Sequence, residues 1–223
     1  MNDVLPAQLT GQLPADTMRR IQRILKGSAV YPEQVVLDHD ELLEMARILR
    51  SMGCAIAYTE GVWDLYHRGH GAYLARGKLD AIEHCVGPER ADQVVMVVGV
   101  DSDALTRKRK EDDLNRPVVP EEERCQVISY HRAVDLITVL NESEVFNRKL
   151  RPDVRIISES TGDNPDLEEM RQHCGHLIRL PPQSPTGTTA RLRKLAQEGG
   201  LQVIDNVRKK LSVALEEAVR ELA

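Results

Sequence analysis

Short apolar runs alternate with amphipathic segments along most of this chain. Apolar positions recur at helical spacing over about 16–26 and over about 40–52, which predicts two helices. Five later runs are almost continuously apolar and have the length of strands: 54–59, 93–100, 134–140, 154–158 and 176–180. Segments with helical spacing separate these runs, and strands of this kind are buried on both faces. The pattern therefore predicts an α/β fold with a parallel sheet covered by helices.

The length of 223 residues suits one α/β domain with extensions. We expect a helical N-terminal extension over 1–35, a main domain over 36–198 and a C-terminal helix over 199–223. Apolar residues follow one side of that last helix: Ile204, Val207, Leu211, Leu215, Ala218 and Leu222. This apolar face could pack against its own domain or contact a second copy of the chain, and both alternatives stay open.

Composition narrows the classes of partner. The net charge of -5 argues against a general nucleic-acid surface, and aromatic residues at 3% argue against stacking on single strands. No apolar run reaches the length of about 18 residues that a membrane span needs. The first residues lack the features of a signal peptide, so we expect a cytoplasmic protein that binds neither nucleic acid nor membrane.

The cysteines predict reduced thiols rather than a disulfide framework or a metal site. They are far apart in the sequence: Cys54, Cys85, Cys125 and Cys174. His173 and His176 flank Cys174, but the segment lacks a second pair of metal ligands. The end of a helix that leads into a strand is the favoured interpretation there.

The stretch His67-Arg68-Gly69-His70 carries the strongest chemical signal. It follows a predicted buried strand and the break at Glu60-Gly61, and it opens a segment with helical spacing. The imidazoles therefore lie at the start of a helix, where free N–H groups attract phosphate. Gly69 allows the backbone and both rings to approach one anion. Phosphate binding is favoured over the alternative that both histidines are structural.

A basic segment gives the second signal. Four cations follow the strand at 93–100, and two arginines come soon after: Arg107, Lys108, Arg109, Lys110, Arg116 and Arg124. One interpretation of these basic residues is a helix face that points into solvent, and the other is a site for a polyphosphate. Ligands of parallel sheets bind outside the carboxyl ends of the strands, and a triphosphate needs several positive groups. The position of the cluster therefore favours a polyphosphate site.

These segments resemble a known family. Gly61-Val62-Trp63-Asp64-Leu65-Tyr66-His67-Arg68-Gly69-His70 is similar to the G-x-F-D-x-x-H-x-G-H motif of cytidylyltransferase-like nucleotidyltransferases, with Trp63 in place of Phe. Ser102-Asp103-Ala104, Lys110, Arg116-Pro117 and Glu122-Glu123-Arg124 follow in the order of the adenylyltransferase domains of ADP-heptose synthase type enzymes. The resemblance covers about 36–195 and implies a Rossmann-like nucleotidyltransferase fold of the HUP type.

The resemblance also implies residue roles. The implied catalytic residues are His67, His70, Lys110 and Arg124. The implied nucleotide-binding residues are Thr59, Gly61, Val62, Trp63, Asp64, Gly69, Lys78, Asp103, Arg116, Thr188 and Thr189. The acceptor side would be Glu159 or Asp163. The chain departs from the family at Glu60, where Asn is usual, at Glu111, where Gly is usual, and at Gly187, where Ser is usual.

The implied reaction is attack by an acceptor phosphate oxygen on the α-phosphorus of a nucleoside triphosphate, with loss of pyrophosphate. Mg²⁺ would bridge the triphosphate without a direct side-chain ligand, and Asp64 would orient the turn or a Mg²⁺-bound water. ATP and a sugar phosphate are favoured as substrates, and family enzymes of this type commonly form homodimers. A CTP-dependent enzyme acting on a polyol or amino-alcohol phosphate or phosphonate, and a non-catalytic nucleotide-binding protein, remain alternatives.

Overall fold

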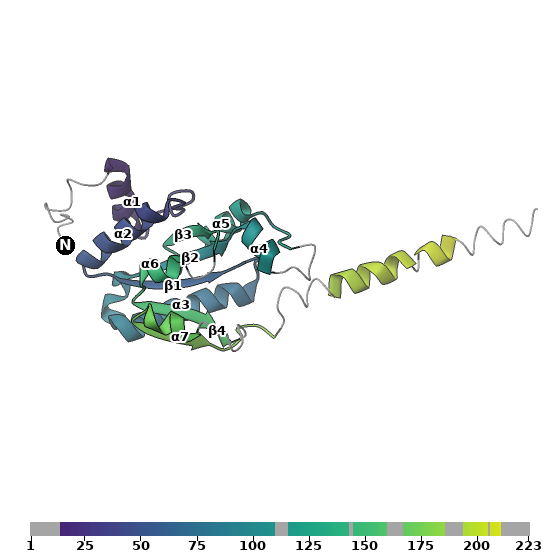
Figure 1. The fold of residues 1–223 in the computed structure, drawn as a ribbon. Coiled ribbons are helices and arrows are strands. Elements are labelled where there is room, and N and C mark those ends of the chain that lie inside the picture. Colours follow the sequence, from purple (N-terminus) through teal and green to yellow (C-terminus); the bar gives the residue numbers. More distant parts are fainter. Residues whose placement is uncertain are drawn as a thin grey trace, which may run out of the picture. The chain divides into compact units, whose positions relative to one another are not determined.

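The structure is a computed structural model that describes residues 14–109, 116–142, 145–159, 167–185, 194–204 and 206–210. The chain divides into two compact units, Met1–Gln183 and Ser184–Ala223. Figure 1 shows the first unit as a sheet with helices on both of its faces. All of the predicted strands belong to this first unit.

One parallel sheet forms the centre of the first unit, with the strand order β3-β2-β1-β4-β5 (Figure 1). The strands are β1 (Ala55–Gly61), β2 (Val94–Asp101), β3 (Leu136–Leu140), β4 (Val154–Ser158) and β5 (His176–Leu180). The predicted α/β class with a parallel sheet is confirmed. The chain adds strands on one side of β1 up to β3 and then crosses to the other side for β4. The reversal lies between β1 and β4, and in parallel sheets ligands usually bind at the carboxyl ends of the strands on either side of such a point.

The connections between strands are helical, as the spacing of apolar residues predicts. The helices are α1 (Ala15–Leu25), α2 (His39–Ser51), α3 (Arg68–Cys85), α4 (Asp103–Arg109), α5 (Glu121–Ser129), α6 (Val145–Leu150), α7 (Leu167–Gln172) and the 3-10 helix η1 (Pro88–Gln93). The turn at His173–Gly175 leads from α7 into β5, as predicted. Among the described residues no three His, Cys, Asp or Glu side chains gather into a metal site.

Two apolar layers cover the sheet. Because side chains alternate along a strand, Ile56 and Tyr58 of β1 face the layer that contains α1, α2 and α6, whereas Ala57 faces the layer of α3 and α5. Gly77 lets α3 approach the sheet closely, since a Cβ there would lie 3.1 Å from the Cδ1 atom of Ile156. The close approach fixes α3, and therefore its N-terminus, relative to β4.

The segment before α2 packs onto the same core. Ile21 of α1 is fully buried with Leu42 and Leu49 of α2. The N–H of Val36 donates to the carbonyl of Ile137 at 2.8 Å, and the N–H of Ile137 donates to the carbonyl of Gln34 at 2.8 Å. These bonds cover the outer edge of β3, which would otherwise expose unpaired backbone groups.

The cysteine thiols are unpaired, as predicted. Burial raises the pKa of Cys125 to about 12 and that of Cys54 to about 11, so both thiols stay protonated near neutral pH. None of the described helices combines the length and apolarity that crossing a membrane would require.

The second unit contains described helical residues at 194–204 and 206–210. The large apolar side chains among these described residues are exposed, and they include Leu201, Ile204 and Val207. The remaining members of the predicted apolar side lie outside the described residues: Leu211, Leu215, Ala218 and Leu222. Packing against its own domain and contact with a second copy both stay predictions.

We predict that Ile21→Ala lowers the free energy of unfolding by about 3 kcal/mol, because it leaves a cavity in a fully buried layer. Urea denaturation followed by circular dichroism measures the change. Leu79→Ala is the matched control, since Leu79 is exposed on α3, and its effect should stay within about 0.5 kcal/mol. Equal effects of the two variants would show that α1 is not part of the core.

Candidate functional site

The turn that contains the two histidines lies at the topological switch of the sheet. It follows β1 directly and leads into α3, while Glu159 follows β4 on the other side of the switch. Glu159 is exposed there. The predicted phosphate-binding and acceptor positions therefore share the carboxyl edge of neighbouring strands.

His67 and His70 are brought together as a stacked pair. Their ring centroids are 4.0 Å apart and the ring planes differ by 24°. His67 is the N-cap of α3, and its Nδ1 atom accepts a hydrogen bond from the N–H of Gly69 at 3.0 Å. This bond requires an unprotonated Nδ1, so the neutral ring of His67 carries its proton on Nε2. Both rings are half-buried and lie at a helix N-terminus, which favours anions.

Trp63 holds the turn in a strained conformation. Trp63 and Leu65 have positive φ angles of 57° and 47°, which non-glycine residues rarely adopt. The indole N–H of Trp63 donates to the carbonyl of Gly99 at 2.9 Å, and its ring meets the ring of His70 edge-on at 5.5 Å. Trp63 is therefore a positioning residue for His70.

Asp64 joins the turn to the segment before α5. Its carboxylate accepts hydrogen bonds from the N–H groups of Val118 and Val119, each at 3.0 Å. Arg116 forms an ion pair with the same carboxylate at 2.7 Å, and both side chains are buried. Asp64 was predicted to orient either the turn or a Mg²⁺-bound water, and these contacts match the first of the two roles.

The buried side chain of Arg124 forms hydrogen bonds with three segments of the chain. Its guanidinium nitrogens donate to the carbonyl of Val62, to the carbonyl of Val119 at 2.9 Å and to the carboxylate of Asp103 at 2.6 Å. The side chain is 1% exposed. Arg116 and Arg124, expected to hold phosphates, are thus bound to acidic or carbonyl groups of the protein itself.

A charge cluster lies beside the turn, and none of its four members was given a role by the family resemblance: Glu60, Asp101, Arg109 and Arg155. Arg155 of β4 lies 3.4 Å from the carboxylate of Glu60 and 4.6 Å from the ring centroid of Tyr58. Arg109 pairs with Asp101 and approaches Glu60 at 3.7 Å. Burial raises the pKa of Asp101 despite the nearby Arg109. Asp101 could have been selected as a site residue from the sequence, because it comes directly after the predicted apolar run 93–100. Nothing in the sequence singles out Arg155 in the same way.

The remaining predicted residues differ in where the structure places them. Thr59 is buried and bonds to the hydroxyl of Tyr73 of α3 at 2.9 Å. Lys78 is not brought to the histidines, because it lies about three turns farther along α3 and pairs with Asp135, before β3, at 2.6 Å. Four predicted positions lie outside the described residues: Lys110, Asp163, Thr188 and Thr189.

We predict that Asp64→Asn lowers the free energy of unfolding by about 3 kcal/mol, because it leaves the buried charge of Arg116 without its partner. The double variant Asp64→Asn with Arg116→Met should lose less than the single variant, and thermal and urea unfolding measure both.

The control for this prediction is the exposed pair of Arg47 and Glu44. Arg47→Met should leave the unfolding transition almost unchanged, because solvent screens an exposed ion pair. A double variant less stable than Asp64→Asn alone would contradict the assigned pairing.

No family model matches the chain. Its sequence relatives include the bifunctional protein HldE of Nitratiruptor sp., 29% identical over 150 residues, covering 66% of this chain and 29% of the relative. HldE of Wolinella succinogenes is 32% identical over 126 residues, covering 56% and 24% respectively. HldE of Acidiphilium cryptum is 28% identical over 218 residues, covering 85% and 42%.

The chain thus spans from about a quarter to about two fifths of the length of these relatives. Among solved structures, the lipopolysaccharide core biosynthesis protein from Thermoplasma volcanium superposes with a TM-score of 0.43 at 20% identity, over 56% of this chain and 95% of that one. The chain is thus similar in sequence to one part of the HldE proteins, in line with its resemblance to the adenylyltransferase type of nucleotidyltransferase.

Proposed function

We propose that this chain is a nucleotidyltransferase that transfers a nucleoside monophosphate from ATP to a sugar phosphate and releases pyrophosphate. The observation that carries the proposal is the stacked pair of His67 and His70 at the N-terminus of α3, at the switch point of a parallel sheet. The HldE relatives support the same class of chemistry.

The proposed mechanism consists of positioning and electrostatic stabilisation. An oxygen of the acceptor phosphate is already anionic, so it attacks the α-phosphorus without a strong general base. His67, with its proton on Nε2, donates a hydrogen bond to the α- or β-phosphate as charge moves onto the leaving pyrophosphate. His70, stacked on it, contributes the second ring, and exposed Arg107 and Lys108 add positive charge at the carboxyl edge of β2.

Mg²⁺ is the cofactor we propose, bound mainly by the triphosphate and water. Asp64 is not available as a ligand, because Arg116 and two backbone N–H groups already bind its carboxylate. Mg²⁺ at nucleotide sites usually keeps several waters and takes few protein ligands, which is the arrangement proposed here. The ion would supply neutralisation of phosphate charge.

ATP is proposed ahead of CTP on the resemblance of Ser102-Asp103-Ala104 and the following residues to adenylyltransferase domains. Glu159, exposed after β4, and Asp163 are the proposed acceptor contacts. We further propose that the protein acts as a cytoplasmic homodimer without nucleic-acid or membrane partners.

We predict that His67→Ala and His70→Ala each lower turnover at least about 100-fold, because each removes a group that stabilises charge on the phosphates. Circular dichroism should show an intact fold, with a loss of about 1 kcal/mol for His67→Ala as its cap bond disappears. His84→Ala is the matched control: it removes a histidine of α3 that bonds to the carbonyl of Asp80, away from the turn. A folded His70→Ala variant with full turnover would refute the assigned role.

The substrate assignment is tested by pyrophosphate release from ATP and from CTP, each with a panel of sugar phosphates and a panel of polyol phosphates. We expect release from ATP with a sugar phosphate, dependent on Mg²⁺. Release from CTP with a polyol phosphate would select the alternative enzyme. Nucleotide binding without release under any pairing would select a non-catalytic nucleotide-binding protein.

A further inference from the structure

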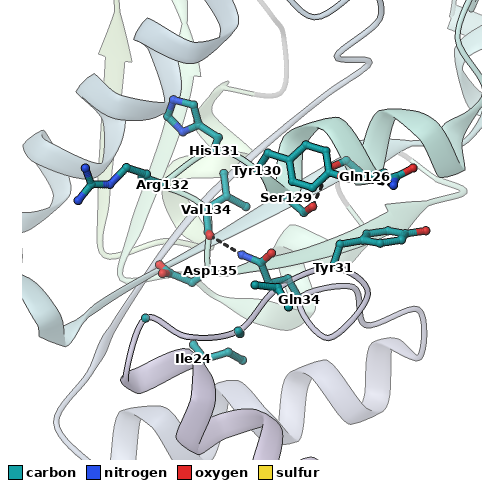
Figure 2. Close-up of a pocket in the computed structure, with 13 residues that line it drawn as sticks. Ile24, Tyr31, Gln34, Gln126, Ser129, Tyr130, His131, Arg132, Val134 and Asp135 are labelled. Carbon is teal, nitrogen blue, oxygen red and sulfur yellow. Dashed lines mark hydrogen bonds between the residues drawn. The ribbon is translucent and has the colours of Figure 1, made fainter.

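A third histidine contacts the first turn of α3. His131 follows α5 and lines a cavity of about 570 Å³ between the segment that joins α1 to α2 and the segment from α5 into β3 (Figure 2). Its ring also lies against α3, since a Cβ on Gly71 would be 3.5 Å from its Nε2 atom. Gly71 follows His70 directly, so His131 contacts the backbone beside a proposed catalytic residue.

The hydrogen bonds of His131 fix the orientation of its ring. Nδ1 accepts a bond from the N–H of Ala133 at 3.2 Å, so the neutral ring carries its proton on Nε2. Burial lowers the pKa of His131, a hydrogen bond with the backbone of Gly71 opposes that shift, and the ring is therefore neutral at neutral pH. An Nε2–H group can only donate to the carbonyl of Gly71, and this bond joins the segment after α5 to the first turn of α3.

Tyr66 of the histidine turn lies next to both His70 and His131. Its ring centroid is 5.6 Å from that of His70 and 6.5 Å from that of His131. Its hydroxyl is buried near Gly71, where a Cβ would lie 3.2 Å away, and it has no hydrogen-bond partner among the described residues. The contribution of Tyr66 to this region is therefore its ring rather than its hydroxyl.

We propose that His131 and Tyr66 are positioning residues for His70. The bond from His131 to Gly71 holds the backbone next to His70, and the ring of Tyr66 packs beside the imidazole of His70 itself. A misplacement of about 1 Å can lower a rate about 100-fold, so residues that hold a catalytic ring affect turnover without touching the substrate. This inference rests on the proposed function, in which His70 stabilises charge on the phosphates.

Two variants at position 131 separate the hydrogen bond from the bulk of the ring. His131 borders the cavity, so a change of its side chain does not empty the apolar core. His131→Phe keeps a ring and removes the donor, whereas His131→Gln keeps an N–H donor. We expect His131→Phe to lower kcat about tenfold and to leave KM for the nucleotide within about twofold, because the lost group acts on the position of His70 rather than on binding. His131→Gln should recover most of the lost kcat.

Two variants at position 66 separate the ring from the hydroxyl in the same way. Tyr66→Phe should leave kcat within about twofold of the unmodified chain, because the hydroxyl has no hydrogen-bond partner among the described residues. Tyr66→Ala removes the ring beside His70 and should lower kcat about tenfold.

The position of His70 is also measured without turnover, from the ¹⁵N NMR signals of the histidine rings in the full chain without nucleotide. His131→Phe and Tyr66→Ala should shift the signals of the His70 ring, and His131→Gln and Tyr66→Phe should shift them less. His39→Phe is the matched control. It removes a half-buried histidine whose Nε2 bonds to the carbonyl of Val139 and whose ring packs on Phe146, in the other apolar layer. It should change neither kcat nor the signals of His70.

Three results would each overturn the proposal. They are a loss of kcat in His131→Phe that His131→Gln does not recover, unchanged His70 signals in folded His131→Phe and Tyr66→Ala variants, and equal shifts of the His70 signals in His39→Phe. An unmodified chain that releases no pyrophosphate from any pair of substrates would instead count against the proposed function. In that case the ring signals still decide whether His131 and Tyr66 hold His70 in place.

Discussion

The arrangement of the candidate site depends on the buried guanidinium of Arg124. Its donors hold the turn after β1 at Val62, the segment before α5 at Val119 and the start of α4 at Asp103. A buried cation is tolerated only when its charge is paired and its donors are satisfied, so these three segments are constrained together. Asp64 provides the reciprocal connection, from the turn to the N–H groups of Val118 and Val119. The histidines therefore project from a turn that charge pairs inside the protein keep in place.

The sequence predicts the sheet well because buried parallel strands appear as uninterrupted apolar runs. The run at 154–158 is β4 with the same bounds, and that at 176–180 is β5. The histidine turn could also be placed, since it follows such a run. The partners of the arginines could not be predicted, because order along the chain does not show whether Arg124 faces a ligand or Asp103. The partner of Lys78 could not be predicted for a related reason, because only packing brings Asp135 to this position on α3.

The glutamate at position 60 shows how the site accommodates a departure from the family pattern. Where the resemblance has a neutral Asn, Glu60 adds a buried carboxylate next to that of Asp101. Two buried acids require cations nearby, and Arg109 and Arg155 supply them from α4 and β4. The hydroxyl of Tyr58 donates to Glu60 at 2.7 Å as well. The substitution is thus part of a compensated cluster that joins three strands and α4, and the two acids and two arginines of this cluster balance in charge.

The N-terminal segment has two structural consequences that arise from the same few bonds. The pairing of Val36 and Gln34 with Ile137 covers the edge of β3, and it also brings the side chain of Gln34 to the carbonyl of Val134. Edge protection alone requires only backbone groups, and it would be served equally well by an apolar side chain at position 34. The amide nitrogen of Gln34 is bound, whereas its oxygen is buried and has no hydrogen-bond partner among the described residues, which costs stability. The glutamine therefore adds a buried side-chain bond, next to the backbone bonds, between the N-terminal segment and the residues that lead into β3.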